Sequence, residues 1–320
     1  GGIGLALAYV ASEGRVRVLN FSGRAPMAAE PEIFTDETKN SGILASMVPG
    51  NVAGWLTLHE TYGTKDRSEL FASAIGYAEE GFPVTYINNV IMTESSNVLK
   101  KFPGSARIIL NDKGFAPVPG TRLKMPQLAG TLREIADGGI ETFYQGELAR
   151  RIVDGAHELG GLYRYEDFEN YRCEWQEPIK INYRGYEVYT TPPNSSAFQV
   201  LQTLKLMERF DPQDLAFQKP DTVHFVLEAM KLCITDRIKY AGDPDYVTAP
   251  MSGLLSKDYA QLQKNRINRL IASSVSGERY SKERSIGALT PGSPGQFDGG
   301  MTTHFVVADR EGNVVTITQT

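Results

Sequence analysis

The sequence predicts a mixed α/β fold, because segments with helical periodicity alternate along the chain with short runs of β-branched and aromatic residues. Two observations carry this prediction. The helical segments end at glycine or proline, which is typical of helix C-termini. The strand-like runs near both ends of the chain come in pairs, and turn residues separate the members of each pair. With 320 residues, of which 41% are apolar, the chain can form one large domain or two ordinary ones.

The N-terminal half is predicted to open with a β-hairpin and to continue with helices. The hairpin joins residues 5–10 to residues 16–20 around the turn Ser12-Glu13-Gly14. Glycine or proline ends most of the helices that follow. They are predicted at residues 53–62, at residues 68–80 with a stop at Pro83, at residues 126–137 closing on Gly138-Gly139, and at residues 146–158 closing on Gly160-Gly161.

The next part of the chain is predicted to contain a strand and two helices. Residues 183–190 favour a strand that bends at Gly185. Ser195 or Ser196 can cap a helix that runs to Phe210. Asp221 is predicted to cap the next helix, in which five apolar residues repeat at helical spacing: Val223, Leu227, Met230, Ile234 and Ile238.

The C-terminal end is predicted to form a second hairpin behind a Gly/Pro/Ser-rich segment at residues 290–300. Residues 303–308 alternate in the manner of a pleated strand, and their β-branched and aromatic content favours a largely buried one. Residues 309–313 supply turn chemistry, and residues 314–320 form a second β-rich run. We call residues 303–320 the C-terminal hairpin.

The most informative residue is Thr302, which stands directly before this hairpin. A threonine hydroxyl is a poor nucleophile at neutral pH, but a threonine at a chain terminus carries its own base, because a free α-amine has a pKa of about 7.7–8.0. Cleavage between Met301 and Thr302 would therefore create a catalyst. Before cleavage, the same hydroxyl could attack the preceding carbonyl, because proximity favours such an acyl shift. Taken alone, the residue has a simpler interpretation as an ordinary strand threonine.

Short motifs recur in a fixed order over nearly the whole chain, and together they resemble those of a known family. They are Gly1-Gly2-Ile3-Gly4, Val48-Pro49-Gly50-Asn51-Val52-Ala53-Gly54, Phe143-Tyr144-Gln145-Gly146, Gly160-Gly161-Leu162 with Asp167, Tyr183-Arg184-Gly185-Tyr186-Glu187-Val188-Tyr189, Pro192-Pro193-Asn194-Ser195-Ser196, Glu228-Ala229-Met230-Lys231, Asp236-Arg237, Gly242-Asp243-Pro244-Asp245, and Thr302-Thr303-His304 with Asp309, Gly312 and Asn313. The ordered set resembles the γ-glutamyltransferase family (glutathione hydrolase, γ-glutamyltranspeptidase) of self-processing N-terminal nucleophile hydrolases.

The resemblance implies the four-layer αββα sandwich of these hydrolases, an α/β (α+β) fold that is incomplete in this chain. Residues 1–301 would belong to the large subunit and residues 302–320 would open the small one. Thr302 would be the nucleophile, released by autocleavage after Met301, and Thr320 would donate or accept a hydrogen bond at its hydroxyl. Compared with the family, the chain lacks an N-terminal helical segment and most of the small subunit. We therefore expect a fragment of a precursor, with the oxyanion hole and lid residues beyond Thr320.

The sharpest indication of substrate is a departure from the family. Family members that act on γ-glutamyl compounds usually carry Asp-Phe-Arg-Glu-x-Ala-Pro, in which the arginine binds the α-carboxylate of the glutamyl group. Here Ser22 stands at the arginine position, and Arg24 follows two residues later. Two residues along an extended chain move a side chain by roughly 6–7 Å. Gly23 would allow a compensating bend, so Arg24 and Ser22 remain candidates for binding the substrate.

Three functions therefore stay open. The resemblance favours an autoprocessed γ-glutamyltransferase or glutathione hydrolase, which transfers the acyl group of a small amide such as glutathione to water or an acceptor amine. A divergent acylase or amidohydrolase on a different acyl group is the first alternative, and the shifted arginine is its evidence. An unprocessed, non-catalytic relative is the second. Typical family members are periplasmic or extracellular, and a signal peptide would lie ahead of the first residue.

Composition excludes several other classes of protein. A net charge of −5 argues against a nucleic-acid-binding protein, which usually shows a basic stripe. The sequence contains no run of about 18 apolar residues of the kind that spans a membrane. The implied mechanism needs no metal or organic cofactor, and no phosphate-binding motif occurs. Cys173 and Cys233 lack metal-ligand spacing and are interpreted as buried packing residues rather than a disulfide.

Several polar residues invite a catalytic reading but have simpler explanations. His304 lacks the Gly-x-Ser-x-Gly context of a serine hydrolase and is interpreted as a satisfied core histidine. Asp243 and Asp245 are more simply part of a turn than a carboxylate pair. The Asn194-Ser195-Ser196 stretch either lines a cleft or caps a helix. Asp236-Arg237 is interpreted as an internal ion pair or a helix surface.

Overall fold

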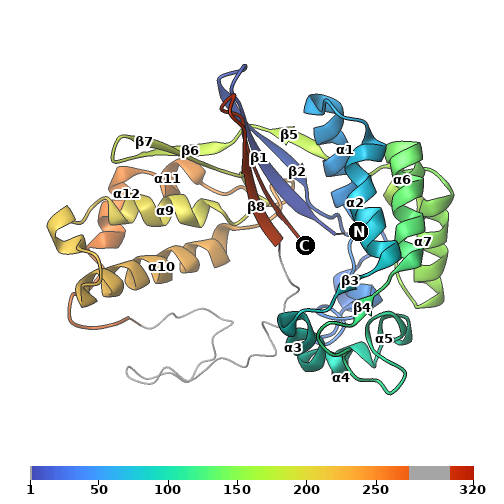
Figure 1. The fold of residues 1–320 in the computed structure, drawn as a ribbon. Coiled ribbons are helices and arrows are strands. Elements are labelled where there is room, and N and C mark those ends of the chain that lie inside the picture. Colours follow the sequence, from blue (N-terminus) through green and yellow to red (C-terminus); the bar gives the residue numbers. More distant parts are fainter. Residues whose placement is uncertain (1, 274–302) are drawn as a thin grey trace. The chain divides into compact units, whose positions relative to one another are not determined.

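The structure, a computed structural model, describes residues 2–273 and 303–320, and these divide into two compact units (Figure 1). The first unit comprises residues 1–4 and 21–173, and the second comprises residues 5–20 and 174–320. Each unit has a hydrophobic cluster of its own. The mixed α/β fold that the sequence predicts is confirmed in both units.

A five-stranded sheet joins the two ends of the chain in the second unit. Its order is β5 (Glu174–Gln176), β2 (Arg15–Phe21), β1 (Gly4–Val10), β9 (Val314–Gln319) and β8 (Thr303–Ala308). Both predicted hairpins are confirmed, because β1 neighbours β2 and β8 pairs with β9 in antiparallel fashion. The first and last strands of the chain therefore share one sheet, with β8 at its edge.

Strand β8 is exposed, which contradicts the prediction of a largely buried strand. All six of its residues are exposed, including Phe305 at 39%, Val306 at 60% and Val307 at 59%. The predicted strand itself is confirmed. It is exposed because β8 is the edge strand of the sheet and, among the described strands, has a neighbour only on its β9 side. In β9, Ile317 is buried.

The rest of the second unit contains a small hairpin and helices that pack on one another. Its elements are β6 (Ile179–Tyr183), β7 (Tyr186–Thr190), α9 (Phe198–Met207), the 3₁₀ helix Pro212–Leu215, α10 (Pro220–Tyr240), α11 (Met251–Leu254) and α12 (Lys257–Lys264). The predicted strand at residues 183–190 is confirmed for Tyr186–Thr190, which form β7, but its start is wrong, because Tyr183 ends β6 and the backbone reverses at Arg184 and Gly185. Both have positive φ angles, 51° and 93°, which is the geometry of a type I′ hairpin turn.

Helix α10 is present as predicted, but it buries a different face. Val223, Leu227 and Ile238 are exposed, whereas Phe225, Ala229 and Cys233 pack into the cluster between α9 and α10, together with Leu206, Met207 and Phe210. Asp221 does not cap this helix, because the helix begins at Pro220 with Lys219 at its N-cap. The apolar spacing therefore predicted the helix correctly but did not predict which of its faces is buried.

The first unit is mainly helical. Its elements are the 3₁₀ helices Pro31–Ile33 and Ile43–Ala45, α1 (Asn51–Tyr62), α2 (Arg67–Glu80), β3 (Phe82–Pro83), α3 (Tyr86–Glu94), α4 (Ser96–Leu99), α5 (Pro103–Ile109), β4 (Arg122–Leu123), α6 (Pro126–Tyr144), α7 (Glu147–Glu158) and α8 (Tyr165–Glu169). The predicted helices at 53–62, 68–80 and 146–158 match α1, α2 and α7. Helix α6 leaves helical geometry at Gly139, near the predicted end, and then resumes.

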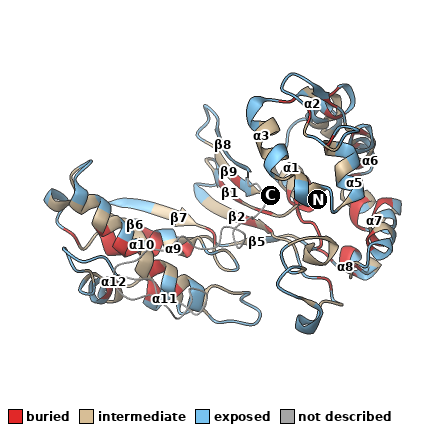
Figure 2. Ribbon diagram, turned by 90° about the horizontal axis from the view of Figure 1, so that it is seen from below, coloured by how far each residue is buried: buried red, intermediate tan, exposed pale blue. Residues whose placement is uncertain are grey.

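An aromatic cluster forms the core of the first unit, where α1, α6, α7 and α8 bury their inner faces (Figure 2). Tyr144 stacks on Tyr171 with ring centroids 5.2 Å apart, and Phe168 meets Tyr163 edge to face at 5.3 Å. The Tyr144 hydroxyl donates to the Pro49 carbonyl, so the buried polar atom is satisfied. Among the helices that the structure describes, none has both the length and the apolar character needed to cross a membrane.

Candidate active site

The C-terminal hairpin has a continuous antiparallel register. Thr303 lies opposite Gln319, His304 opposite Thr318, and Ala308 opposite Val314 at the turn end. Directly opposed residues in such a ladder project from the same face of the sheet. His304 and Thr318 consequently share a face, and Thr303 and Gln319 share the other.

The turn that closes this hairpin is held by side chains. Asp309 accepts the Asn313 backbone N–H at 2.8 Å through one oxygen and the Asn313 side-chain amide at 2.7 Å through the other. These bonds lower the pKa of Asp309, with the side-chain bond the larger cause. Gly312 has a φ of 88°, a conformation that favours glycine. Asn313 also accepts the Ala11 N–H at 2.8 Å, so the turn is tied to the loop between β1 and β2.

One predicted site residue, Thr320, lies at the open end of the hairpin. Thr320 directly follows β9 and is exposed. Thr302 and Met301 lie outside the described residues. The interpretation of His304 as a core histidine is wrong, because the residue is exposed on the edge strand. Its ring nitrogens are nevertheless satisfied, at 2.8 Å from the Thr318 hydroxyl and 3.4 Å from the Thr316 hydroxyl.

The other two predicted site residues, Ser22 and Arg24, lie together in the first unit. We call residues 22–27 the arginine segment. Arg24 forms an isolated antiparallel bridge with Val48, with N–O distances of 2.8 and 3.4 Å. The Ser22 carbonyl accepts the Tyr171 hydroxyl at 2.8 Å. Arg24 is exposed and Ser22 is half-buried.

Near the end of strand β2, Asn20 forms hydrogen bonds with polar side chains of the second unit. The Asn20 side-chain amide donates to Asn194 at 3.1 Å and lies 3.4 Å from the Gln176 oxygen. Ser195 accepts the Ala197 N–H at 3.1 Å, a local turn at the start of α9. The prediction that Ser195 or Ser196 caps this helix is wrong, because Ala197 stands at the N-cap of α9 and no side chain caps it. The interpretation of Asn194-Ser195-Ser196 as cleft-lining stays a prediction.

The profile of the Gamma-glutamyltranspeptidase family matches this chain over residues 1–320. The chain belongs to that family. The match covers every segment that carries the ordered motifs noted in the sequence, the C-terminal hairpin included.

Individual members of the family give the same picture. The chain is 34% identical over 317 residues to a glutathione hydrolase proenzyme of Pseudomonas sp. (strain A14), which covers 97% of this chain and 53% of that protein. It is equally 34% identical over 325 residues to an acylase ACY 1 proenzyme of Pseudomonas sp. (strain SE83), covering 97% and 55%. The crystal structure of Helicobacter pylori γ-glutamyltranspeptidase superposes with a TM-score of 0.81 at 30% identity, covering 92% of this chain and 85% of that one. The chain spans about half the length of the curated relatives it matches.

The remaining candidates from the sequence are structural in this family member. Cys173 and Cys233 form no disulfide with each other. Cys233 is fully buried as predicted, and burial raises its pKa to about 12. The prediction of burial is wrong for Cys173, which is only half-buried and lies 3.1 Å from the Thr57 hydroxyl. Asp243 accepts the Asp245 N–H at 3.0 Å, which supports the turn reading. Within residues 2–273 and 303–320, no group of three or more His, Cys, Asp or Glu side chains is arranged to hold a metal ion.

Asp236 is neither ion-paired to Arg237 nor on the helix surface. It is buried and accepts the Tyr259 hydroxyl at 2.9 and 3.0 Å, together with the side-chain amides of Gln202 and Gln263. Burial and the Asp236 carboxylate raise the pKa of Tyr259 to about 12. This network joins α9, α10 and α12, so the Asp236-Arg237 motif contributes to packing.

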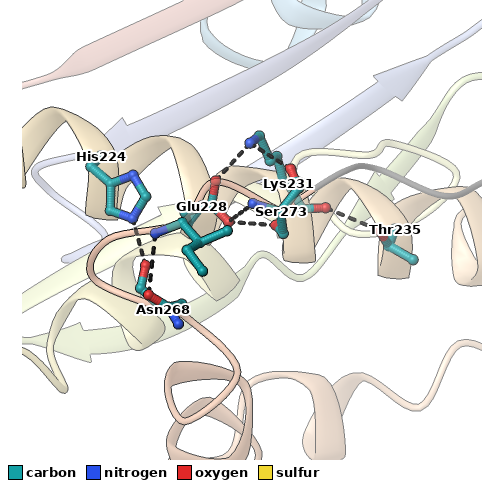
Figure 3. Close-up of polar contacts among 7 residues, drawn as sticks. His224, Glu228, Lys231, Thr235, Asn268 and Ser273 are labelled. Atoms are coloured by element: carbon teal, nitrogen blue, oxygen red, sulfur yellow. Dashed lines mark hydrogen bonds and ion pairs between the residues drawn. The ribbon is translucent and has the colours of Figure 1, made fainter. Parts of the chain in front are cut away.

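A second polar network holds the chain where it leaves the second unit's helices. Residues 268–273, which we call the strap, run along one face of α10 (Figure 3). His224 lies 2.7 Å from the Asn268 carbonyl, and Arg269 donates to Asp221 at 3.1 Å. The helix residues that contact the strap are spaced three or four apart, at 221, 224, 228 and 231, and therefore share a face.

Ser273 is the most completely bound residue of the strap. Glu228 accepts its backbone N–H at 3.0 Å and also its hydroxyl, and Lys231 donates to its carbonyl at 2.9 Å. Lys231 and Glu228 are themselves paired at 2.6 Å, with the Glu228 side chain only 3% exposed. Burial opposes ionisation of Glu228, but the bonds from Lys231 and Ser273 outweigh it and lower its pKa. The sequence marked Glu228 and Lys231 only as motif residues and gave no signal of their partner 42–45 residues away.

We predict that Glu228→Gln destabilises the protein by about 2–3 kcal/mol at neutral pH. The estimate lies below the cost of breaking a fully buried pair, because Lys231 keeps access to water. Since the folded pKa lies below the ordinary 4.5, the contribution is full above about pH 4.5 and is lost as the pH falls through the folded pKa. Denaturant unfolding of wild type and variant at several pH values measures the difference.

The matched control is Glu134→Gln, which breaks the exposed pair with Arg151. It should cost less than about 1 kcal/mol. A Glu228→Gln cost as small as that of the control, or one that does not shrink in acid, would contradict the assigned role of the pair.

Proposed function

We propose that this chain carries the nucleophile of a self-processing threonine hydrolase of the γ-glutamyltransferase type. The observation that supports this most is the register of the C-terminal hairpin. Each described pair moves one step toward the open end, from His304 opposite Thr318 to Thr303 opposite Gln319. In the sequence, Thr302 directly precedes β8 and Thr320 directly follows β9. We infer that the Thr320 hydroxyl forms a hydrogen bond with the Thr302 hydroxyl, since opposed residues of an antiparallel pair are near neighbours.

Self-processing would begin with attack of the Thr302 hydroxyl on the Met301 carbonyl carbon. The bond from that carbon to the Thr302 nitrogen breaks, and the nitrogen takes up the hydroxyl proton, which leaves an ester between Met301 and Thr302. Water then hydrolyses the ester. The products are a Met301 carboxylate and a chain that begins with Thr302, whose hydroxyl and α-amine are both free.

Turnover would use the same hydroxyl and the new amine. The hydroxyl attacks the amide carbonyl of the donor, the α-amine accepts its proton and returns it to the leaving amine, and the acyl group stays on Thr302 as an ester. Water releases the acid, or an acceptor amine takes the acyl group. Thr320 would orient the hydroxyl in each attack. No step of this scheme requires a metal or organic cofactor.

The proposed architecture follows from this scheme. Residues 1–301 would form the large-subunit portion and residues 302–320 the start of the small subunit, both from one precursor. The names of the two proenzyme relatives support such a precursor. We infer that the complete precursor has the four-layer αββα sandwich, to which the five-stranded sheet of the second unit would contribute one layer.

The acyl group is proposed to carry a carboxylate that Arg24 binds. An exposed guanidinium on a fixed backbone suits bidentate recognition of a carboxylate. A γ-glutamyl donor such as glutathione is the first choice, because a glutathione hydrolase proenzyme is among the most similar relatives. A specific observation favours a second candidate, an acylase for a different acyl group: Ser22 replaces the usual arginine, and an acylase relative is equally similar.

Thr320→Val is predicted to slow both self-cleavage and turnover about 10–100-fold, because it removes a hydrogen bond worth about 1.5–3 kcal/mol to a reacting hydroxyl. Valine keeps the shape and strand preference of threonine. The control is Thr318→Val, on the same face of the same strand, which should leave both rates within about twofold. The test measures two rates in the full-length precursor: the conversion of the uncut chain into two fragments on a denaturing gel, and the hydrolysis of the donor. Equal rates for Thr320→Val and wild type would count against the role of Thr320.

The identity of the acyl group is tested with three p-nitroanilides. The γ-glutamyl donor has the carboxylate and the amine, the glutaryl donor keeps only the carboxylate, and the butyryl donor has neither. Arg24→Ala should raise KM about tenfold or more for the first two and leave the third unchanged, whereas Arg107→Ala, an exposed arginine of the same unit, should change none. A preference for γ-glutamyl over glutaryl supports the transferase, and the reverse preference supports the acylase. Equal KM values for Arg24→Ala and wild type would remove Arg24 from the site.

A further inference from the structure

The backbone of the arginine segment is fixed at three points within the first unit. At its start, Tyr171 donates its hydroxyl to the Ser22 carbonyl at 2.8 Å. In its middle, Arg24 is bridged to Val48 through both its N–H and its carbonyl. At its end, Asp167 accepts the Met27 N–H at 2.9 Å. A segment of six residues that is held at both ends and at its centre has little freedom to shift.

Close packing removes most of the remaining freedom. A side-chain carbon placed on Gly23 would lie 2.5 Å from Ile3 Cγ2 and 2.9 Å from Met47 Cβ. Both distances are shorter than non-bonded carbon atoms tolerate. Gly23 is therefore required here by the close approach of two neighbouring segments, rather than as a hinge.

Asp167 links this segment to helix α8. One of its carboxylate oxygens accepts the Met27 N–H, and the other accepts the Arg164 N–H at 2.7 Å, at the start of the helix. The residue is only 8% exposed. A buried carboxylate costs free energy unless its lone pairs are used, and both oxygens are used here. The bond to the Arg164 N–H belongs to the start of helix α8. The bond to the Met27 N–H is not part of the helix and joins Asp167 to the arginine segment.

Tyr171 reaches the segment from the aromatic core. Its ring stacks on Tyr144, which is itself buried and bonded to the Pro49 carbonyl. The hydroxyl that holds Ser22 is therefore at the end of a ring that is buried in the core of the first unit. Asp167 and Tyr171 lie four residues apart and hold opposite ends of the same short segment.

We propose that Asp167 and Tyr171 are positioning residues that set the place of the Arg24 guanidinium and thereby the recognition of a carboxylate on the acyl donor. The inference rests on the proposed function, since it assumes that Arg24 contacts the donor. A guanidinium binds a carboxylate through two parallel hydrogen bonds, and a displacement of about 1 Å spoils that geometry. Neither Asp167 nor Tyr171 needs to touch the donor for this effect.

The test is a KM-against-kcat comparison in the full-length, self-cleaved protein. Asp167→Asn and Tyr171→Phe keep the shape of each side chain and each remove one bond to the arginine segment. Both should raise KM for the γ-glutamyl and glutaryl p-nitroanilides about tenfold, with kcat within about twofold of wild type. KM for the butyryl p-nitroanilide, and the rate of self-cleavage, should not change.

The controls lie in the same helix. Glu166→Gln removes the same charge from an exposed neighbour, and Tyr165→Phe removes a tyrosine hydroxyl bond to a different carbonyl, that of Gln145. Both should behave as wild type with all three donors. Thermal unfolding of every variant identifies a general loss of stability, and Tyr171→Phe, which retains the stacked ring, remains folded enough to assay.

The outcomes separate this inference from the proposed function. If Arg24→Ala raises KM for the carboxylate donors while Asp167→Asn and Tyr171→Phe do not, the positioning role is wrong and the function stands. If these two variants impair the butyryl donor equally, their role is merely structural and the inference is wrong. If wild type is not cleaved, or Arg24→Ala has no effect, the proposed function fails and this inference fails with it.

Discussion

The register of the C-terminal hairpin is the constraint on which the account of this chain depends. Side chains alternate between faces with a period of two, so a slip of one residue would move every side chain of β8 to the opposite face. The turn prevents such a slip, because Asp309 binds both the backbone and the side chain of Asn313, and Asn313 also binds Ala11. A bond network at one end of the hairpin thus fixes which residues meet at the other end, where Thr320 lies.

The two terminal hairpins and most of the longer helices could be predicted from local sequence, because turns and helix ends carry their own chemistry. The hairpins around residues 11–14 and 309–313 and the helices α1, α2 and α7 are of this kind. The short helices α3, α4, α5 and α8 were not predicted. Burial could not be predicted in the same way. The apolar alternation of β8 indicated a buried strand, yet β8 is an edge strand, and the apolar stripe of α10 faces outward while Glu228 and Asp236 are buried. Which face is buried depends on the neighbouring element, and the pattern within one element does not contain that information.

The residues of the candidate site also fall into those that could be predicted from the sequence and those that could not. Thr302, Thr320 and Arg24 could be proposed from the sequence because residue type, position and resemblance to a family pointed to them. Asp167 and Tyr171 could not, because their contacts with Met27 and Ser22 cross 140 and 149 residues of chain. A motif identifies residues that meet a substrate more readily than residues that hold such residues in place. The structure identifies residues that hold others in place, and Asp167, which the sequence offered only as a motif residue, is one of them: it accepts the Met27 N–H.

The most direct test is to ask where a donor's acyl group becomes attached. The full-length wild type and a Thr302→Val variant would be incubated with the glutaryl and γ-glutamyl p-nitroanilides, quenched in acid, and mapped by intact and peptide mass spectrometry. The account predicts two chains in the wild type, one beginning at Thr302 and carrying the acyl mass on that residue, and a single unmodified chain in the variant. An uncut wild-type chain, or an acyl group attached to any residue other than Thr302, would contradict it.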